Sequence, residues 1–457
     1  MNIIIYNNKI MTYNLEKFMD YVNIKNPWEK EFLQSVEEVA WTIIPFINEN
    51  PKYQNKAILE RMVEPERSIT FRVAWLDDSG KIQVNRGFRF EFNSAIWPYK
   101  WGLRFHPSVN SSILKFLWFE QVFKNALTTL PMWGWKGWSD FDPKWKSDNE
   151  IMKFCQSFMS ELYRHIWANT DVPAGDIWVG AREIWYLFGQ YKKIKNEFTG
   201  ILTWKALEFW GSLIRSEATW YGLVYFMKNM LEVKNDSLKN KKVLISGSWN
   251  VAQYAAEKCI ELWAKVLTMS DSSWTIYDEE WIDSEKLEFI KQIKNIDRKR
   301  ISEYIKDFPK AVFLKWERPW NIKADIAFPC ATQNEIEETD AQNLVKNWII
   351  AIWEWANMPS TPQAINIIVE NNLLFSPAKA SNAGWVAVSG LEMSQNSMRY
   401  NWTKEEVDKK LIQIMSEIHS SCARYWKKEN WEIDYIAWAN IAWFVKVADA
   451  MLAQGVV

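Results

Sequence analysis

The sequence has little glycine, few cysteines and no long apolar run. Its 457 residues include only 15 glycines, roughly half of the usual share of about 7 per cent. The four cysteines lie far apart without CxxC spacing, which argues against a disulfide scaffold or a zinc site and fits a reduced, cytoplasmic protein. No apolar run reaches the roughly 18 residues of a membrane span. The formal net charge of -1 indicates neither a nucleic acid nor a membrane as partner.

Tryptophan, in contrast, is abundant, with 31 residues. The stretch "LPMWGWKGWSDFDPKWKSD" at 130–148 places four tryptophans in a polar, turn-like segment. A bulky apolar ring normally requires a pocket, whereas glycine suits turns and close backbone approaches. The simplest interpretation is that many tryptophans occupy positions where the fold needs glycine.

The segment 241–273, "KKVLISGSWNVAQYAAEKCIELWAKVLTMSDSS", makes this interpretation specific. A strand at Val243–Ile245 leads into Gly247-Ser248-Trp249, a helix follows, and a second strand at Lys265–Met269 ends near Asp271. With glycine at 249, the turn reads G-x-G-x-x-A, which is typical of dinucleotide binding between a strand and a helix. Trp263 likewise stands where a helix would end on a glycine.

With tryptophan replaced by glycine, long motifs of the chain match those of a known protein family, both in sequence and in their order along the chain. They include "WPYKWGLRFHPSV" (97–109), "DVPAGDIWVGAREIWYLFGQY" (171–191), "SGSWNVAQYA" (246–255), "FPCATQNEI" (328–336) and "NAGWVAVSGLEMSQN" (382–396). The chain resembles the hexameric glutamate dehydrogenases of the Glu/Leu/Phe/Val dehydrogenase superfamily, and especially the bacterial NADP type, over nearly its whole length after Met11. Trp75, Trp320 and Trp402 match positions where this family tolerates or prefers tryptophan.

The departures from the family are nearly all tryptophan for glycine. We therefore hypothesise that these tryptophans are encoded by UGA codons, which the conceptual translation reads as tryptophan and the cell decodes as glycine. A decaying gene would also have lost motif lysines, aspartates and asparagines, and these are intact.

The resemblance implies roles for the charged residues. It assigns Lys100, with the Ser389 hydroxyl, to the side-chain carboxylate of the substrate. It assigns Gln121, Lys124 and the backbone near position 101 to the α-carboxylate. Lysines among glycine-rich turns suit a substrate with two carboxylates, because charge-assisted hydrogen bonds can hold both ends.

The tryptophan-rich stretch at 130–148 contains Lys136, which the resemblance identifies as the catalytic lysine. Asp176 corresponds to the proton-transfer carboxylate, and the backbone of Gly175 should face the substrate. These roles imply hydride transfer from Cα of glutamate to NADP or NAD. Water assisted by Lys136 then attacks the imine, and release of 2-oxoglutarate and ammonium follows.

The cofactor contacts are implied in the same way. An acid at Asp271 usually favours the ribose 2′-OH of NAD, whereas "SDSS" (270–273) resembles NADP-preferring members, so we expect NADP, with NAD as the alternative. The expected contacts are Gly247, Ser248, Asn250 and Val251 in the turn, Asp271 and Ser272 at the ribose, and Thr219 and Asn357 near the nicotinamide. The three histidines have no metal-ligand spacing, and we expect no metal.

The expected fold class is α/β. A mixed α/β substrate domain (1–210) should precede a doubly wound, Rossmann-type domain (211–432), with strands near Val243, Val266, Asp325 and Ile349. A C-terminal helix (within 433–457) should return to the first domain, and the resemblance suggests a homohexamer.

Two alternatives remain open. One is a dehydrogenase for another amino acid, against which Lys100 argues, because a cation facing an apolar side chain would be left unpaired. The other is an inactive binding or assembly protein, if the tryptophans are literal.

Overall fold

The computed structural model describes residues 12–96, 98–108, 110–215, 218–272, 274–356, 359–376, 383–425 and 435–456. The chain divides into two compact units. Unit 1 comprises residues 1–213, 389–404 and 437–457, and unit 2 comprises residues 214–388 and 405–436. Each unit has its own sheet and its own buried core, so each is described by itself.

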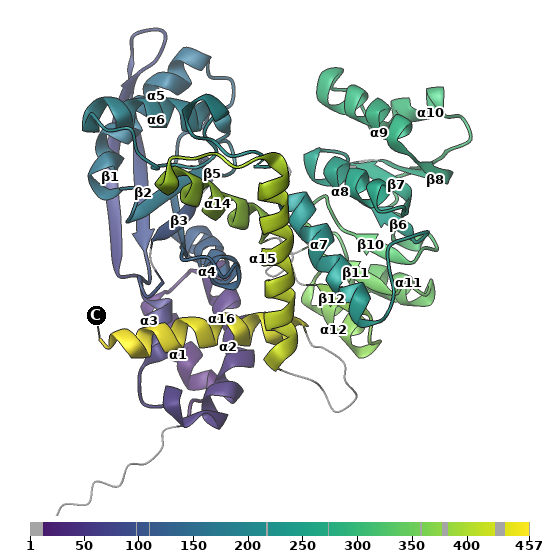
Figure 1. Ribbon diagram of the computed structural model, residues 1–457, viewed down its shortest axis with the longest axis horizontal. Helices are drawn as coiled ribbons and strands as arrows, with labels where there is room; N and C mark the ends of the chain where they lie inside the picture. Colours follow the sequence, from purple (N-terminus) through teal and green to yellow (C-terminus); the bar gives the residue numbers. More distant parts are fainter. Residues whose placement is uncertain are drawn as a thin grey trace, which may run out of the picture. The chain divides into compact units, whose positions relative to one another are not determined.

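Unit 1 is built on a five-stranded mixed sheet with the order β1-β2-β4-β3-β5. Strands β1 and β2 form a long antiparallel hairpin, and β4, β3 and β5 run parallel to one another (Figure 1). The strands are β1 (Arg67–Leu76), β2 (Ile82–Glu91), β3 (Tyr99–Phe105), β4 (Trp133–Ser139) and β5 (Asp171–Gly175). The centre of this sheet therefore contains Lys100, predicted to bind substrate, on β3 and Lys136, predicted to be catalytic, on β4.

The helices of unit 1 begin at recognisable caps. Asn110 accepts from the Ile113 N–H at the start of α4, and Ser147 forms a capping box with Glu150 at the start of α5. One face of α5 is buried through Phe154, Phe158 and their neighbours. The helices are α1 (Leu15–Lys25), α2 (Lys30–Glu49), α3 (Ile58–Val63), α4 (Ser111–Leu127), α5 (Asp148–Leu162), α6 (Ala181–Lys195), the second half of α14 (Gly384–Met398) and most of α16 (Tyr435–Gln454).

Unit 2 contains a seven-stranded sheet with the order β12-β11-β10-β6-β7-β8-β9. Strands β12 to β7 in this order are parallel, and β8 and β9 are antiparallel additions at one edge. The strands are β6 (Lys242–Ile245), β7 (Lys265–Asp271), β8 (Trp274–Ile282), β9 (Val312–Lys315), β10 (Ile326–Phe328), β11 (Ala351–Trp353) and β12 (Leu374–Ser376). The strand order reverses between β6 and β10, where doubly wound sheets bind ligands.

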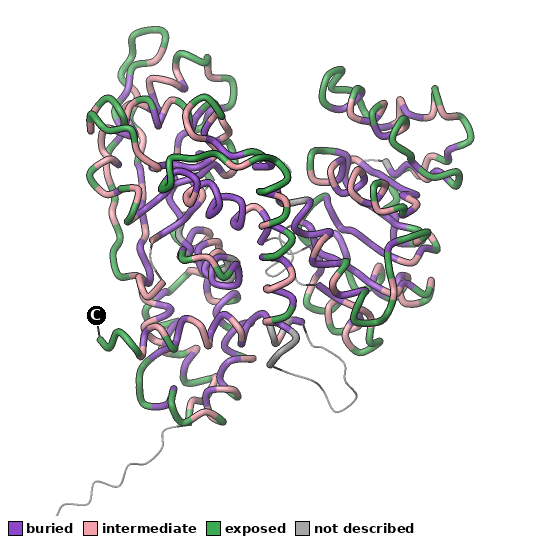
Figure 2. Tube along the Cα trace, in the orientation of Figure 1, coloured by how far each residue is buried: buried purple, intermediate pink, exposed green. Residues whose placement is uncertain are grey.

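Helices cover this parallel sheet, and its strands are buried in Figure 2. They are α7 (Ala218–Val233), α8 (Asn250–Glu261), α9 (Ser284–Lys291), α10 (Tyr304–Asp307), α11 (Glu338–Lys346), α12 (Pro362–Glu370), the first half of α14, and α15 (Lys404–Tyr425). The core under α11 and α12 includes Leu244, Ile352 and Ile368. Continuous burial on both faces explains why these strands read as short apolar runs.

The expected fold class is confirmed. The predicted strands near Val243, Val266, Asp325 and Ile349 correspond to β6, β7, β10 and β11. Most of α16 belongs to unit 1, where the Lys446 ammonium donates to the Ala126 carbonyl at the end of α4 (2.7 Å). Trp263 directly follows the C-cap of α8 and has a left-handed φ of 64°. Among the described residues, no helix has the length and apolarity that crossing a membrane requires.

Candidate active site and cofactor turn

The parallel strands of unit 1 bring a lysine and an aspartate into contact. Lys136 lies on β4 opposite Gly102 of β3, and Asp176 directly follows β5. The Lys136 Nζ lies 2.8 Å from the Asp176 Oδ2, and both side chains are largely buried. The structure therefore brings together the two residues to which the sequence assigned catalysis.

A second cation contacts the same carboxylate. The Arg104 guanidinium donates to the Asp176 Oδ2 at 3.3 Å. Burial alone would raise the pKa of Asp176, but Lys136, Arg104 and hydrogen bonds lower it to about 2. Arg104 was not among the predicted site residues. Its position four residues after Lys100 puts it on the same face of β3, which is a signal that could have been used.

Glycines permit the close packing around this pair. A side chain at Gly134 would lie 2.3 Å from the Val122 nitrogen, so only glycine lets α4 approach β4 this closely. A side chain at Gly102 would meet Asp176 and the Lys136 Nζ at about 3 Å. The space beside Gly175 holds the carbonyl of Val179 and the indole of Trp204. A side chain at position 175 would therefore collide with both groups.

The predicted substrate residues lie on neighbouring elements of unit 1. Lys100 is 3 % exposed on β3, and Gln121 lies on α4. Between them, the Asn125 side chain accepts from the Gln121 Nε2 (2.8 Å) and donates to the Lys100 carbonyl (3.0 Å). Ser389 is buried on α14, next to Gly390, which packs against Met132. The side chain of the fifth predicted residue, Lys124, lies outside what the structure describes.

The second candidate site is the turn between β6 and α8 in unit 2. Gly247 has a left-handed φ of +83°, and its N–H donates to the Ser270 hydroxyl at 2.8 Å. A side chain at Gly247 would lie 3.1 Å from the Cys330 carbonyl. Ser248 is fully buried, and its hydroxyl has no hydrogen-bond partner among the described residues. Asn250 and Val251 then begin α8, as predicted for a phosphate-binding turn.

Trp249 conflicts with this turn. It is the N-cap of α8 and is 56 % exposed, and the Lys294 Nζ lies 4.9 Å from its ring centroid. The backbone, the orphaned Ser248 hydroxyl and the helix N-terminus suit a pyrophosphate, but the indole stands where backbone should approach it. The turn fits a dinucleotide only if residue 249 has no side chain. Asn357 lies outside the described residues, as does the side chain of Thr219.

Asp271 ends β7, but its carboxylate is already engaged. It lies 3.4 Å from the Lys294 Nζ and 3.7 Å from the Arg300 guanidinium, and it accepts from the Ile301 N–H. Arg300 also donates to the Ser272 hydroxyl at 2.7 Å. Two cations therefore join Asp271 and Ser272, the two residues that were expected at the ribose. Lys294 lies in a π-helical turn (Gln292–Ile296), and none of the sequence motifs includes it, so the sequence offered no signal for it.

A buried carboxyl group also lies behind the turn. Glu335 accepts from the backbone N–H of Ala331 (2.8 Å) and Thr332 (3.2 Å). Burial raises its pKa to about 7, in opposition to these hydrogen bonds and one from Ser246. The Ser246 hydroxyl in turn accepts from the Cys330 backbone N–H at 2.8 Å. Glu335 thus supports the loop that packs against Gly247.

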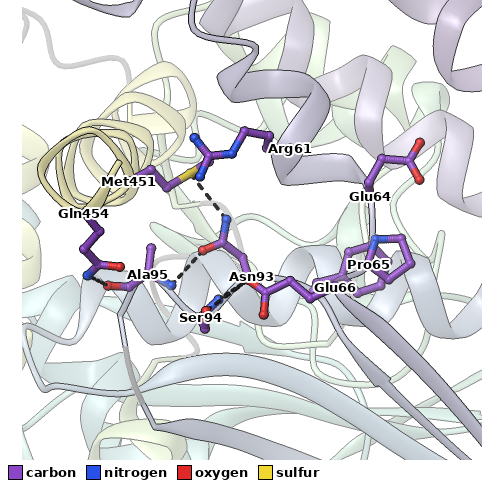
Figure 3. Close-up of a pocket in the computed structure, with 10 residues that line it drawn as sticks. Arg61, Glu64, Pro65, Glu66, Asn93, Ser94, Ala95, Met451 and Gln454 are labelled. Carbon is purple, nitrogen blue, oxygen red and sulfur yellow. Dashed lines mark hydrogen bonds between the residues drawn. The ribbon is translucent and has the colours of Figure 1, made fainter. Parts of the chain in front are cut away.

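A further cavity, of about 190 Å³, lies in unit 1 between the end of β2, the segment after α3, and α16 (Figure 3). Its polar groups are engaged with one another. Asn93 donates to the Met451 sulfur, Ser94 donates to Glu66, and Gln454 donates to the Ala95 carbonyl. This cavity is therefore a packing feature and contains none of the predicted site residues.

Comparisons with known proteins identify the family. The family model "Glutamate/Leucine/Phenylalanine/Valine dehydrogenase" matches residues 211–455, and "Glu/Leu/Phe/Val dehydrogenase, dimerisation domain" matches residues 65–193. The chain is 56 % identical to the NADP-specific glutamate dehydrogenase of Haemophilus influenzae, covering 97 % of this chain and 99 % of that one. It is 52 % identical to the NAD-specific glutamate dehydrogenase of Bacteroides fragilis, covering 97 % and 100 %.

Among solved structures, Plasmodium falciparum glutamate dehydrogenase 2 matches with a TM-score of 0.93 and 54 % identity, covering 97 % of both chains. The family models cover both units, and the similarity to the named relatives extends over nearly the whole chain. The chain therefore belongs to the Glu/Leu/Phe/Val dehydrogenase family.

Proposed function

We propose that the chain is a glutamate dehydrogenase, which reversibly deaminates L-glutamate to 2-oxoglutarate and ammonium. The observation that carries this is the buried contact between Lys136 and Asp176, with Lys100 and Gln121 on the adjoining strand and helix. The two relatives named above, which are glutamate dehydrogenases covering nearly the whole chain, support the same activity. Lys100 with Ser389 favours a carboxylate side chain over the apolar ones that other family members accept.

The roles of the residues follow from their chemistry. Lys100 and Ser389 would hold the side-chain carboxylate, and Gln121 and Lys124 the α-carboxylate, which positions the Cα–H bond. NADP, when bound, supplies the acceptor for the hydride from Cα. Lys136 would activate the water that attacks the resulting imine.

Asp176 would then carry protons between Lys136 and the reacting nitrogen. Its two cationic neighbours keep it ionised between proton transfers, since they lower its pKa. The backbone of Gly175 would border the substrate beside this pair.

The cofactor proposed is NADP, with NAD as the weaker alternative. Lys294, Arg300 and the Ser272 hydroxyl gather around Asp271. The two cations outnumber the carboxylate, so an incoming 2′-phosphate would find a positive site rather than a free acid. Gly247, Ser248, Asn250 and Val251 would hold the pyrophosphate, and Thr219 and Asn357 the nicotinamide end.

The assay that tests the function compares substrates and cofactors on one preparation. We expect turnover of glutamate with NADP, weaker turnover with NAD, and little turnover of leucine. Turnover of leucine above that of glutamate would contradict the substrate, and a preference for NAD would contradict the role of Lys294 and Arg300.

We also propose that most tryptophans are glycine in the cell. Nine have a left-handed φ between 55° and 76°, a conformation that costs a bulky side chain about 1–2 kcal/mol. They are Trp28, Trp145, Trp178, Trp204, Trp210, Trp263, Trp281, Trp316 and Trp348. Most of them are also strongly exposed, which is unusual for a large apolar ring.

Two of the tryptophans expected to be genuine have a different environment. Trp75 and Trp320 are buried, and their indole N–H groups donate to the Asn85 side chain (2.9 Å) and the Glu335 carbonyl (3.2 Å). With Trp402, they define the glycine form of the protein, in which every other tryptophan is glycine. UGA codons at the replaced positions would support this proposal, and UGG codons there would contradict it. Literal tryptophans would favour the inactive binding protein instead.

The remaining proposals concern organisation. We infer a cytoplasmic homohexamer, in which residues 1–210 with 433–457 bind substrate and make the subunit contacts, and residues 211–432 bind the cofactor. The match of residues 65–193 to a dimerisation domain supports assembly. Light scattering of the glycine form would test it, and a monomer would contradict it.

A further inference from the structure

Asn125 connects two of the proposed substrate residues. It is 0 % exposed on α4. Its Nδ2 donates to the Lys100 carbonyl on β3 at 3.0 Å, and its Oδ1 accepts from the Gln121 Nε2 one helical turn earlier at 2.8 Å. A single buried amide thus joins the residue proposed for the side-chain carboxylate to the one proposed for the α-carbon end.

The direction of these bonds is fixed by chemistry. A backbone carbonyl can only accept, so the Asn125 amide must turn its Nδ2 toward Lys100. Its Oδ1 then faces Gln121, which must donate to it from Nε2. The orientation of the Gln121 amide is therefore set by a carbonyl on a neighbouring strand. Among the described residues, none forms a hydrogen bond with the Oε1 of Gln121 or with its second N–H.

The packing of α4 keeps the groups that form these two hydrogen bonds in position. Gly134 of β4 lets the backbone of Gln121 and Val122 approach to distances that any side chain would prevent. Helix α4 is thereby held against β4, which carries Lys136, while Asn125 holds it to β3. Gln121 has little freedom to move or to flip its amide.

We propose that Asn125 is a positioning residue that makes Gln121 recognise both polar groups on the α-carbon of an amino acid. The free N–H of Gln121 suits the α-carboxylate, and its Oε1 accepts from the α-ammonium. This inference rests on the proposed function, and it deepens that function by separating the two substrates. Glutamate has the α-ammonium, whereas 2-oxoglutarate does not, so the contact to Oε1 forms with glutamate alone.

A residue that merely stabilises α4 would not separate the two substrates. Loss of the Asn125 amide should raise the KM for glutamate about tenfold, the effect of one hydrogen bond to a charged group. The KM for 2-oxoglutarate should rise less than about threefold, because only the weaker orientation of the carboxylate contact is lost. The KM for NADP should stay unchanged.

The test measures both reaction directions in the glycine form and in the variants Asn125→Ala and Asn125→Ser. The serine variant retains a hydroxyl that can donate to Lys100 but cannot reach Gln121. Gln121→Met, which keeps Asn125, should likewise raise the KM for glutamate more than the KM for 2-oxoglutarate. It provides the test if both Asn125 variants fail to fold. Asn110→Ala is the matched control, because it removes the cap of the same helix. It should lower the melting temperature and leave the ratio of the two KM values unchanged.

Equal changes in both KM values, or none, would overturn the role of Asn125, as would the same asymmetry in Asn110→Ala. Absence of glutamate turnover in the unsubstituted glycine form would instead contradict the proposed function itself.

Discussion

Each compact unit buries a carboxyl group at its candidate site, and the two groups are held in opposite ways. Asp176 in unit 1 lies between two cations, Lys136 at 2.8 Å and Arg104 at 3.3 Å, and its pKa falls to about 2. Glu335 in unit 2 receives backbone N–H groups, and burial raises its pKa to about 7. The same functional group can thus be held as an ion between two cations, or as a buried acceptor under a loop.

The largest expected effect comes from breaking the pair in unit 1. Lys136→Met and Asp176→Asn should each lower kcat about a thousandfold in the glycine form, because each removes a proton-transfer group. Steady-state assays with saturating NADP measure this. Lys81→Met, on the exposed turn of the β1–β2 hairpin, is the control and should leave kcat unchanged. A loss below tenfold in both site variants would contradict their catalytic roles.

The two carboxyl groups should give the unfolding free energy opposite pH dependences. The raised pKa of Glu335 contributes stability below pH 4.5, which is lost as pH rises through 7. Glu335→Gln should remove this pH-dependent loss of unfolding free energy, which amounts to at most about 3 kcal/mol at pH 8. Urea unfolding from pH 5 to pH 8 measures it.

Asp176→Asn is the counterpart in unit 1. The lowered pKa of Asp176 contributes stability above pH 4, which is lost as pH falls toward 2. The variant should therefore flatten the acid side of the profile and leave the range from pH 5 to pH 8 as it is. The same pH profile in both variants would contradict the contrast between the two sites.

Restoring one tryptophan tests the turn in unit 2. A glycine form that keeps Trp249 should bind NADP about 100-fold more weakly, since the indole overfills the approach to the pyrophosphate. Binding of 2-oxoglutarate should be unchanged, because Trp249 lies in the other unit from Lys100 and Gln121. Calorimetric titration with each ligand measures both. An unchanged affinity for NADP would contradict the inference that Trp249 obstructs binding of the pyrophosphate.

The smallest effect compares two exposed tryptophans. Keeping Trp263, which has a φ of 64°, should lower the unfolding free energy by about 1 kcal/mol relative to glycine. Keeping Trp41, which is 71 % exposed inside α2, should raise it by about 0.5 kcal/mol, because glycine weakens a helix interior. Changes of the same sign at both positions would contradict the conformational argument for glycine.

Much of the architecture could be predicted from the sequence, because short apolar runs and turn motifs mark β6, β7, β10 and the segments around Lys136 and Gly247. The contact between Lys136 and Asp176 followed only from the family resemblance, since 40 residues separate the two in the chain. Arg104 could have been found from its place on the same face of β3 as Lys100, whereas Asn125 acts through contacts between elements that no local pattern records. Lys294 reaches Asp271 from a π-helical turn, a local geometry that the side-chain periodicity does not indicate.

We propose that this chain is a dehydrogenase in which most of the tryptophans in the given sequence are glycine in the cell. Peptide mass spectrometry of the protein from its native cells tests it most directly, over the peptides that contain residues 131–146 and 243–258. The account predicts glycine at positions 133, 135, 138 and 249. Tryptophan at these positions would contradict it and would leave Lys136 and the cofactor turn crowded by side chains that the proposed chemistry cannot accommodate.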